Sequence, residues 1–156
     1  MAPSSIVFNS SDWNSKSIVD SFKNTGFLLV VNPFIDMKGS LEQLREKLKA
    51  ADLKTLPMYE EGRSSSKRFP GEANERVVLK NMSDDWECVN TIRSQYIKVG
   101  CDILYAIEEY MKLPPNSITL KHEQSSNDLI FVKYYKDQIG NNRLGSHCDF
   151  GTLTLV

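Results

Sequence analysis

The feature that most constrains this chain is an apolar stripe through residues 83–111. Hydrophobic side chains recur there at steps of three and four residues, which is the spacing of one face of an α-helix. The stripe consists of Trp86, Val89, Ile92, Tyr96, Val99, Ile103, Ile107 and Tyr110. The sequence therefore predicts a long helix whose apolar face covers one side of a sheet. Gly100 weakens the centre of this helix, and the Leu-Pro-Pro run that starts at Leu113 ends it.

Two β-prone runs near the N-terminus enclose a shorter helical pattern. They occupy residues 5–8 and residues 27–31, and the second run is continuously apolar. We expect Ser11 or Asp12 to cap the start of the helix between them and Gly26 to follow its end. The side chains that share one face of this helix are Ile18, Val19 and Phe22. The segment is thus predicted to be a strand–helix–strand unit.

A second helix is predicted at residues 40–53, because Ser40 and Gln43 form a capping-box pair ahead of it. Its apolar positions are Leu41, Leu44, Leu48 and Ala51. Residues 55–78 then lose periodicity and are rich in Ser, Gly and Pro, which is typical of a long loop. This stretch also contains Arg63, Lys67 and Arg68. These cations could meet an anionic ligand, but a solvated loop explains them more simply.

Composition excludes several classes of partner. The formal net charge of the 156 residues is -1, so no basic field for nucleic acid exists. No apolar run approaches the ~20 residues that cross a bilayer, and the N-terminus lacks the pattern of a secretory signal. The cysteines are odd in number and form no C-x-x-C pair; they are Cys88, Cys101 and Cys148. These observations favour a reduced, cytoplasmic protein with no nucleic-acid or membrane partner.

Residues 144–156, LGSHCDFGTLTLV, contain two metal-competent side chains, His147 and Asp149. In an extended segment, residues two apart point to the same side, so this pair can aim at one point while Cys148 points away. One imidazole and one carboxylate, with a second histidine from elsewhere, make the facial triad of non-haem Fe(II) oxygenases. Gly145 and Gly151 flank the pair and give the backbone freedom to turn.

An isolated His-x-Asp is weak evidence, because most such pairs are a surface histidine and a solvated aspartate. A zinc site that uses Cys148 is disfavoured, since its side chain should face away from His147. Beyond the pair, Leu153 and Leu155 alternate with Thr152, Thr154 and Val156. We therefore expect residues 152–156 to form a strand with one buried face.

The context of the pair resembles the 2-oxoglutarate/Fe(II)-dependent oxygenases of the isopenicillin N synthase-like superfamily. There the His-x-Asp is followed by an aromatic residue, a Gly and a Thr-Leu-rich strand, as in residues 144–156. Residues 129–137, LIFVKYYKD, are similar to the preceding strand, and residues 111–117, MKLPPNS, to the turn after the family's long helix. Residues 17–35 resemble its N-terminal helix and strand.

This resemblance implies an α/β (α+β) fold. A helical N-terminal layer would cover the first strands of an incomplete double-stranded β-helix, or jelly roll. Residues 1–115 would be the N-terminal region of the family. Residues 116–156 would begin the Fe(II)/2-oxoglutarate oxygenase domain, truncated here. The implied activity is the oxidation of an unidentified small molecule.

The resemblance also implies roles for single residues. His147 and Asp149 match the first two Fe(II) ligands. Tyr135 matches a tyrosine that lines the 2-oxoglutarate or substrate pocket, although a tyrosine packed in the core fits equally well. Lys133 and Lys136 depart from the family, which often has a polar amide and a proline there, so the contact with the co-substrate is in doubt.

The family's distal histidine ligand and its Arg-x-Ser for 2-oxoglutarate lie well after the His-x-Asp, and neither occurs in residues 150–156. His122 matches no ligand and is predicted to be an exposed histidine. We therefore expect the isolated chain to be inactive. Two readings stay open. The sequence is the first part of an oxygenase whose coding sequence resumes downstream, or it is a non-catalytic relic or partner-binding module that associates through an open sheet edge.

Overall fold

The computed structural model describes residues 5–7, 13–31, 37–56, 59–61, 74–79, 86–123, 127–134, 149 and 151–156. Helices and short strands both occur, so the predicted mixed α/β class is confirmed, whereas a jelly roll stays a prediction. The chain divides into two units that are discontinuous in sequence. The first contains Met1–Met37 and Thr91–Asn127, and the second contains Lys38–Asn90 and Asp128–Thr154. The predicted domain division between residues 115 and 116 stays a prediction.

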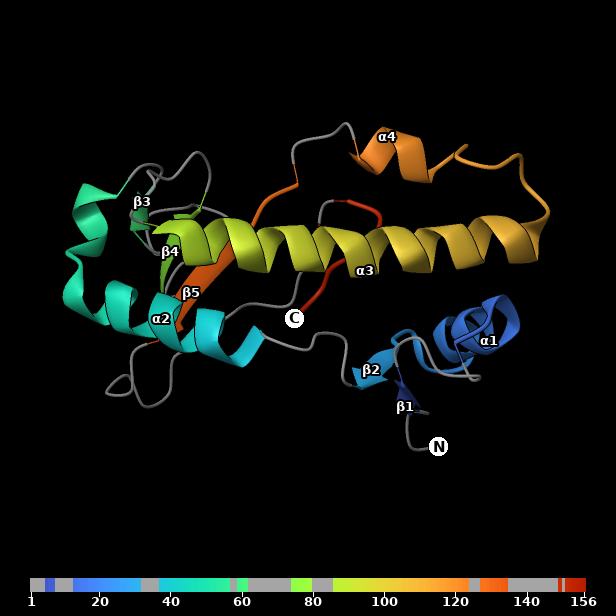
Figure 1. The fold of residues 1–156 in the computed structure, drawn as a ribbon, viewed down its shortest axis with the longest axis horizontal. Coiled ribbons are helices and arrows are strands. Elements are labelled where there is room, and N and C mark those ends of the chain that lie inside the picture. Colours follow the sequence, from blue (N-terminus) through green and yellow to red (C-terminus); the bar gives the residue numbers. More distant parts are fainter. Residues whose placement is uncertain are drawn as a thin grey trace. The chain divides into compact units, whose positions relative to one another are not determined.

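The first unit begins with the predicted strand–helix–strand arrangement (Figure 1). Strand β1 is Ser5–Val7, helix α1 is Ser15–Thr25, and strand β2 is Leu29–Val31. β1 and β2 run parallel, with Ile6 opposite Val30. Parallel neighbours need a crossover between them, and α1 provides it. The arrangement is confirmed, although β2 is shorter than the apolar run that predicted it.

The two ends of α1 follow local capping chemistry. Asn14 is the N-cap, and its Oδ1 accepts a hydrogen bond from the Ser17 backbone N–H at 2.9 Å. The predicted cap at Ser11 or Asp12 is therefore wrong, because all three residue types are good caps and sequence alone does not choose among them. Gly26 follows the helix with φ 79°, a left-handed conformation that suits glycine, as predicted.

The second unit contains a three-stranded antiparallel sheet in the order β3-β4-β5. Its elements are helix α2 (Met37–Ala50, with Met37 itself in the first unit), the 3₁₀ helix η1 (Leu53–Thr55), and the strands β3 (Tyr59–Glu61), β4 (Asn74–Val78) and β5 (Ile130–Tyr134). The central strand places Val77 opposite both Tyr59 and Phe131. Val77 is fully buried, so the core of this unit lies against β4.

Two predictions for this part of the chain are corrected. Residues 55–78 are not one long loop, because β3 and β4 form within them; their Arg63, Lys67 and Arg68 lie outside the described residues. β4 pairs with β3 and also with β5, which begins more than fifty residues after β4 ends, so a local pattern could not reveal the second pairing. Helix α2 begins at Met37, so Ser40 lies inside the helix and does not cap it. Leu44 and Leu48 are buried as predicted.

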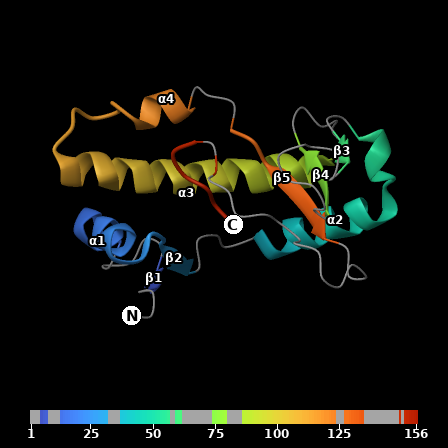
Figure 2. The same ribbon diagram turned by 180° about the vertical axis from the view of Figure 1, so that it is seen from behind.

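The apolar stripe forms helix α3, Glu87–Met111, which is one continuous helix in both views (Figures 1 and 2). Its most buried apolar positions are Val89, Ile92, Val99 and Ile103, each at most 3% exposed. The stripe is thus confirmed as a buried face, although Tyr110 at its end is 37% exposed. A short helix, α4, follows at Thr119–Glu123. Among the helices of the described ranges, none is long and apolar enough to cross a membrane.

The predicted strand at residues 152–156 is not formed. Leu153 and Leu155 are less exposed than their neighbours Thr152, Thr154 and Val156, so the alternation that suggested a strand is present. A strand also needs a hydrogen-bonded partner. Within the described part of the chain, no strand is paired with this segment.

Helix α3 ends in a Schellman motif built on a residue that is not glycine. Lys112 has φ 55°, and its N–H donates to the Glu109 carbonyl at 3.1 Å. The Leu113 N–H donates to the Glu108 carbonyl at 3.0 Å. These are the two bonds of the motif, and its left-handed position normally carries glycine because a Cβ is strained there.

Replacing Lys112 by glycine is therefore expected to raise the free energy of unfolding by about 0.5–1 kcal/mol, after the entropy that glycine adds to the unfolded chain. Urea unfolding followed by circular dichroism measures the change. Lys112→Ala is the matched control, because it also removes the ammonium group but keeps the Cβ. Equal stability of the two variants would show that the left-handed conformation costs nothing here.

Candidate functional site

The described part of the predicted metal motif is Asp149 and residues 151–156, and the chain bends at Gly151 and Thr152. The Asp149 side chain is exposed, and the Thr154 Oγ1 donates a hydrogen bond to its Oδ2 at 2.8 Å. Gly151 lies between them with φ 115°, a backbone conformation that residues with a Cβ rarely adopt. The glycine thus allows the chain to turn, which confirms the predicted role of this position. The predicted turn at Gly145 lies outside the described residues.

The other predicted site residues are placed as follows. His147 and Tyr135 lie outside the described residues, so the convergence of His147 with Asp149 stays a prediction. His122 lies in α4 and is partly buried, and its carbonyl accepts a hydrogen bond from the Asn127 Nδ2 at 2.9 Å. The prediction of an exposed histidine at position 122 is therefore wrong. Lys133 lies on β5 and is exposed.

The donor chemistry of the predicted pair fits a divalent transition metal. An imidazole nitrogen and a carboxylate oxygen are ligands for Fe(II), Mn(II) and Zn(II). Asp149 can supply the carboxylate oxygen, because its side chain is at the surface and accepts a hydrogen bond from the Thr154 hydroxyl group. Among the residues that the structure describes, no three His, Cys, Asp or Glu side chains cluster around a common point.

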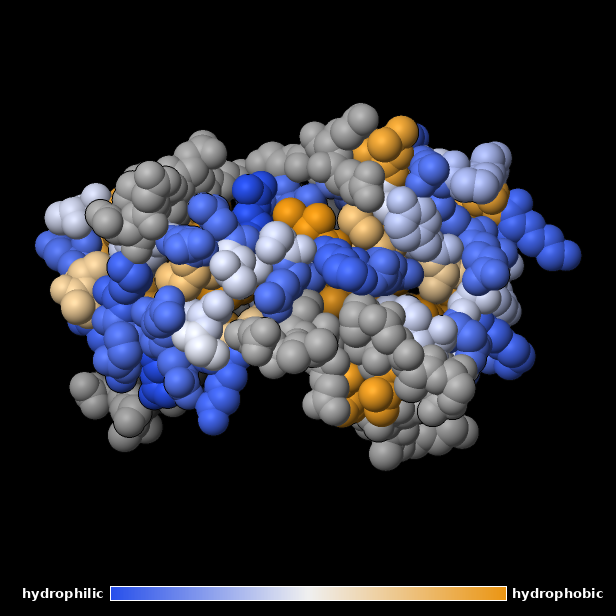
Figure 3. All heavy atoms as spheres, viewed as in Figure 1, coloured by the Kyte–Doolittle hydropathy of each residue, from blue (hydrophilic) through white to orange (hydrophobic). Residues whose placement is uncertain are grey.

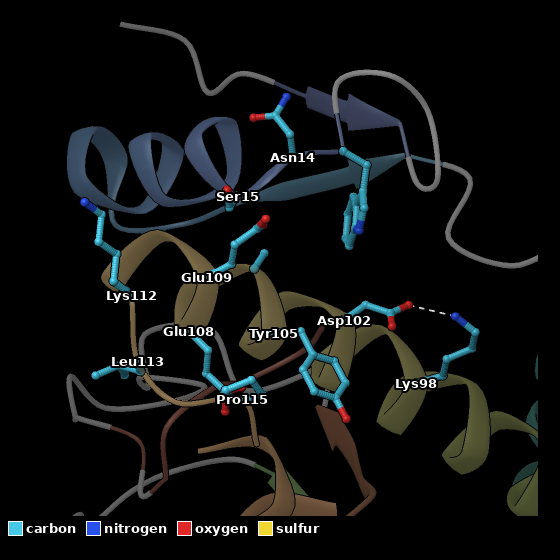
Figure 4. Close-up of a pocket in the computed structure, with 12 residues that line it drawn as sticks. Asn14, Ser15, Lys98, Asp102, Tyr105, Glu108, Glu109, Lys112, Leu113 and Pro115 are labelled. Atoms are coloured by element: carbon cyan, nitrogen blue, oxygen red, sulfur yellow. Dashed lines mark hydrogen bonds and ion pairs between the residues drawn. The ribbon is translucent and has the colours of Figure 1, made fainter. Parts of the chain in front are cut away.

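A separate pocket of about 650 Å³ lies within the first unit, between the start of α1 and the C-terminal half of α3 (Figure 4). Its volume is in the range of small-molecule sites. It is lined by Trp13, Asn14, Ser15, Lys98, Asp102, Tyr105, Ala106, Glu108, Glu109, Lys112, Leu113 and Pro115. The two helices are also joined outside the pocket, where the Lys23 Nζ donates to the Tyr110 hydroxyl at 3.0 Å.

Several polar groups of this pocket are engaged by the protein itself. Lys98 and Asp102 form an ion pair at 2.7 Å. In Figure 4 the Glu109 side chain extends toward Ser15 of α1, whereas Glu108 extends in the opposite direction. Both charges of the Lys98–Asp102 pair lie on α3 and neutralise each other, so they do not select a ligand. No sequence pattern indicated this pocket, because a Lys–Asp pair four residues apart is typical of a solvated helix face.

Among the described residues of the first unit, Glu108 is unusual for an ionisable residue, because it is only 2% exposed. One carboxylate oxygen accepts hydrogen bonds from the N–H groups of Ile118 and Thr119, each at 2.7 Å, and the other accepts from the Asn116 N–H at 2.9 Å. Burial alone would raise the pKa of Glu108. The donated hydrogen bonds from Thr119, Ile118 and Asn116 outweigh burial and hold that pKa below its ordinary value.

The carboxylate of Glu108 thus binds the backbone that leads into α4 and fixes it to the end of α3. This contact was not predicted from the sequence. The sequence offered only a weak signal: Glu108 lies one turn after the apolar Leu104, on a face where an unpaired carboxylate would be costly. The short segment that follows starts a new helix and therefore offers unpaired N–H groups.

Large apolar side chains are exposed on the β1–β2 sheet and just before β2. Val7, Phe27 and Leu29 are 41%, 50% and 49% exposed, and Figure 3 shows hydrophobic atoms at the surface over these strands. Parallel sheets are normally covered on both faces. The sequence predicted association with a partner through an open sheet edge at residues 152–156. These residues form no strand. Association with a partner chain stays a prediction.

Near its motif, the resemblance to the oxygenase superfamily is carried by residues 144–156, and of these the structure describes Asp149 and residues 151–156. Their geometry is compatible with a carboxylate ligand on a glycine-containing turn. Known proteins add no assignment. No family model, no curated protein and no solved structure matches the chain.

Proposed function

We propose that His147 and Asp149 are two of the three protein ligands of an Fe(II) ion in a 2-oxoglutarate-dependent oxygenase that acts on a small molecule. The observation that carries this proposal is the turn at Asp149. An exposed carboxylate, two residues after a histidine, is held by the Thr154 hydroxyl across a glycine with positive φ. Such a carboxylate is accessible and oriented, as ligation of a metal requires.

The proposal assigns further roles through the family resemblance. The jelly roll would enclose the site, and Tyr135 would contact 2-oxoglutarate. Bound iron would supply activation of dioxygen, while His147 and Asp149 would hold it on one side and leave other positions open. The third ligand is not identified, because residues 150–156 contain no histidine and His122 is the only other one. A reducing, cytoplasmic setting is supported by the free thiols of Cys88 and Cys101.

Mn(II) binding by the purified 156-residue chain tests the proposal. Mn(II) is a redox-stable substitute for Fe(II), and its free and bound forms are distinguished by electron paramagnetic resonance. We expect the parent chain to bind Mn(II), and we expect the affinity to fall about tenfold or more in His147→Ala and in Asp149→Ala. A tenfold loss corresponds to only ~1.4 kcal/mol of binding free energy for the side chain that is removed. Asp128→Ala is the control, because Asp128 is an exposed aspartate outside the motif.

The same samples, given Fe(II), 2-oxoglutarate and ascorbate, separate binding from catalysis. Two ligands hold iron incompletely, so the chain is expected to form no succinate above the His147→Ala control. Succinate that depends on both His147 and His122 would identify His122 as the third ligand. Equal Mn(II) binding by the parent chain and both ligand variants would rule out the proposed metal site.

A further inference from the structure

We infer that Thr154 is a positioning residue that orients the Asp149 carboxylate for metal binding; this inference rests on the proposed function. The Thr154 Oγ1 lies 2.8 Å from the Asp149 Oδ2, which is the usual length of an O–H···O hydrogen bond. Because the acceptor is an ionised carboxylate, the bond is stronger than one between neutral groups. The contact is local, since only five positions separate the two residues.

Gly151 lies between the two residues, and its backbone conformation favours this contact. Gly151 has φ 115°, and a Cβ added to it would meet no atom within 4 Å. Space around the glycine is therefore not the constraint. The constraint is conformational, because an L-residue held in a sparsely populated backbone region costs about 1–3 kcal/mol. Glycine thus permits the turn that returns Thr154 to Asp149.

The hydroxyl group has a chemical consequence for the carboxylate. An aspartate side chain rotates readily at its terminal bond, so the plane of a surface carboxylate is poorly defined. The hydrogen bond from Thr154 to one oxygen restricts that rotation and so helps to orient the group for ligation. Partners of this kind around metal ligands typically change metal affinity by about 10–100-fold. Thr154 is exposed and takes part in no core, so its loss should change affinity and leave stability nearly unchanged.

Mn(II) titration of the full 156-residue chain tests this role with matched variants. Thr154→Val removes the hydroxyl and keeps the branched shape, and it is expected to weaken Mn(II) binding about tenfold or more. Thr154→Ser keeps a hydroxyl and should restore affinity to within about threefold of the parent chain, which a purely steric role would not predict. Gly151→Ala should weaken binding as well, because it disfavours the turn.

Thr152→Val is the matched control, since Thr152 is also exposed and lies two residues from Thr154. We expect it to bind Mn(II) like the parent chain. The variants at Thr152 and Thr154 should melt within about two degrees of the parent chain, because surface changes alter stability little, whereas Gly151→Ala should melt lower because it strains the backbone. Parent-like affinity in Thr154→Val, or an equal loss in Thr152→Val, would overturn the positioning role while the metal site stands. A parent chain that binds no more Mn(II) than Asp149→Ala would overturn the metal site itself, and this inference with it.

Discussion

Replacing Glu108 by alanine is expected to lower the melting temperature by about 5–10 °C, the largest effect of any single polar substitution that we propose. The substitution leaves the N–H groups of Asn116, Ile118 and Thr119 without their acceptor. The Thr119 N–H is buried, so water cannot fully replace the lost carboxylate. Thermal unfolding followed by circular dichroism measures the change.

The effect of Glu108 should also depend on pH in a defined direction. Its pKa in the folded chain is below its ordinary value of 4.5, so its contribution to stability is complete well above pH 4.5. That contribution is lost as pH falls through the folded-state pKa. The stability difference between the parent chain and Glu108→Gln should therefore shrink below pH 4.5.

Glu109→Gln is the control for this experiment, because Glu109 is the exposed neighbour on the same helix. It should change the melting temperature by no more than about two degrees. A melting temperature of Glu108→Ala within that same margin would show that the contact to the start of α4 contributes little.

Replacing Ile103 by alanine is expected to lower the free energy of unfolding by about 2–5 kcal/mol, because it removes buried methyl groups and leaves a cavity. Ile103 is 1% exposed and lies in the buried stripe of α3. Urea unfolding gives the change from the midpoint and slope. Met111→Ala on the same helix is the control, because Met111 is 58% exposed, and a change within about 0.5 kcal/mol is expected. Equal losses in the two variants would mean that the stripe is not the core of this helix.

The parts of the fold that the sequence predicted are those with local causes. The stripe of α3 and the strand–helix–strand unit follow from side-chain periodicity, and Gly26 follows from the conformation that a helix end requires. Strand β4 was missed because one of its two partners, β5, is far away in the sequence. The cap at Asn14 was missed because Ser11 and Asp12 are equally good caps.

The same distinction applies to the candidate site. His147 and Asp149 stand out because metal ligands must be particular residue types at a particular spacing. The hydrogen bond from Thr154 could not be predicted, because it depends on the backbone angle at Gly151. The role of Glu108 depends equally on where the chain turns after α3, and glutamate near a helix end is common in any sequence.

The pairing of β4 with β5 sets an order of events during synthesis. Val78 pairs with Ile130, so the sheet of the second unit is completed only after 52 further residues (130 minus 78) have been translated. At roughly 5–20 residues per second, this takes about 3–10 s, during which the hairpin of β3 and β4 has an uncovered edge. All of α3 emerges from the ribosome in that interval. A newly made chain is therefore most open to wrong strand pairing while its longest helix is being made.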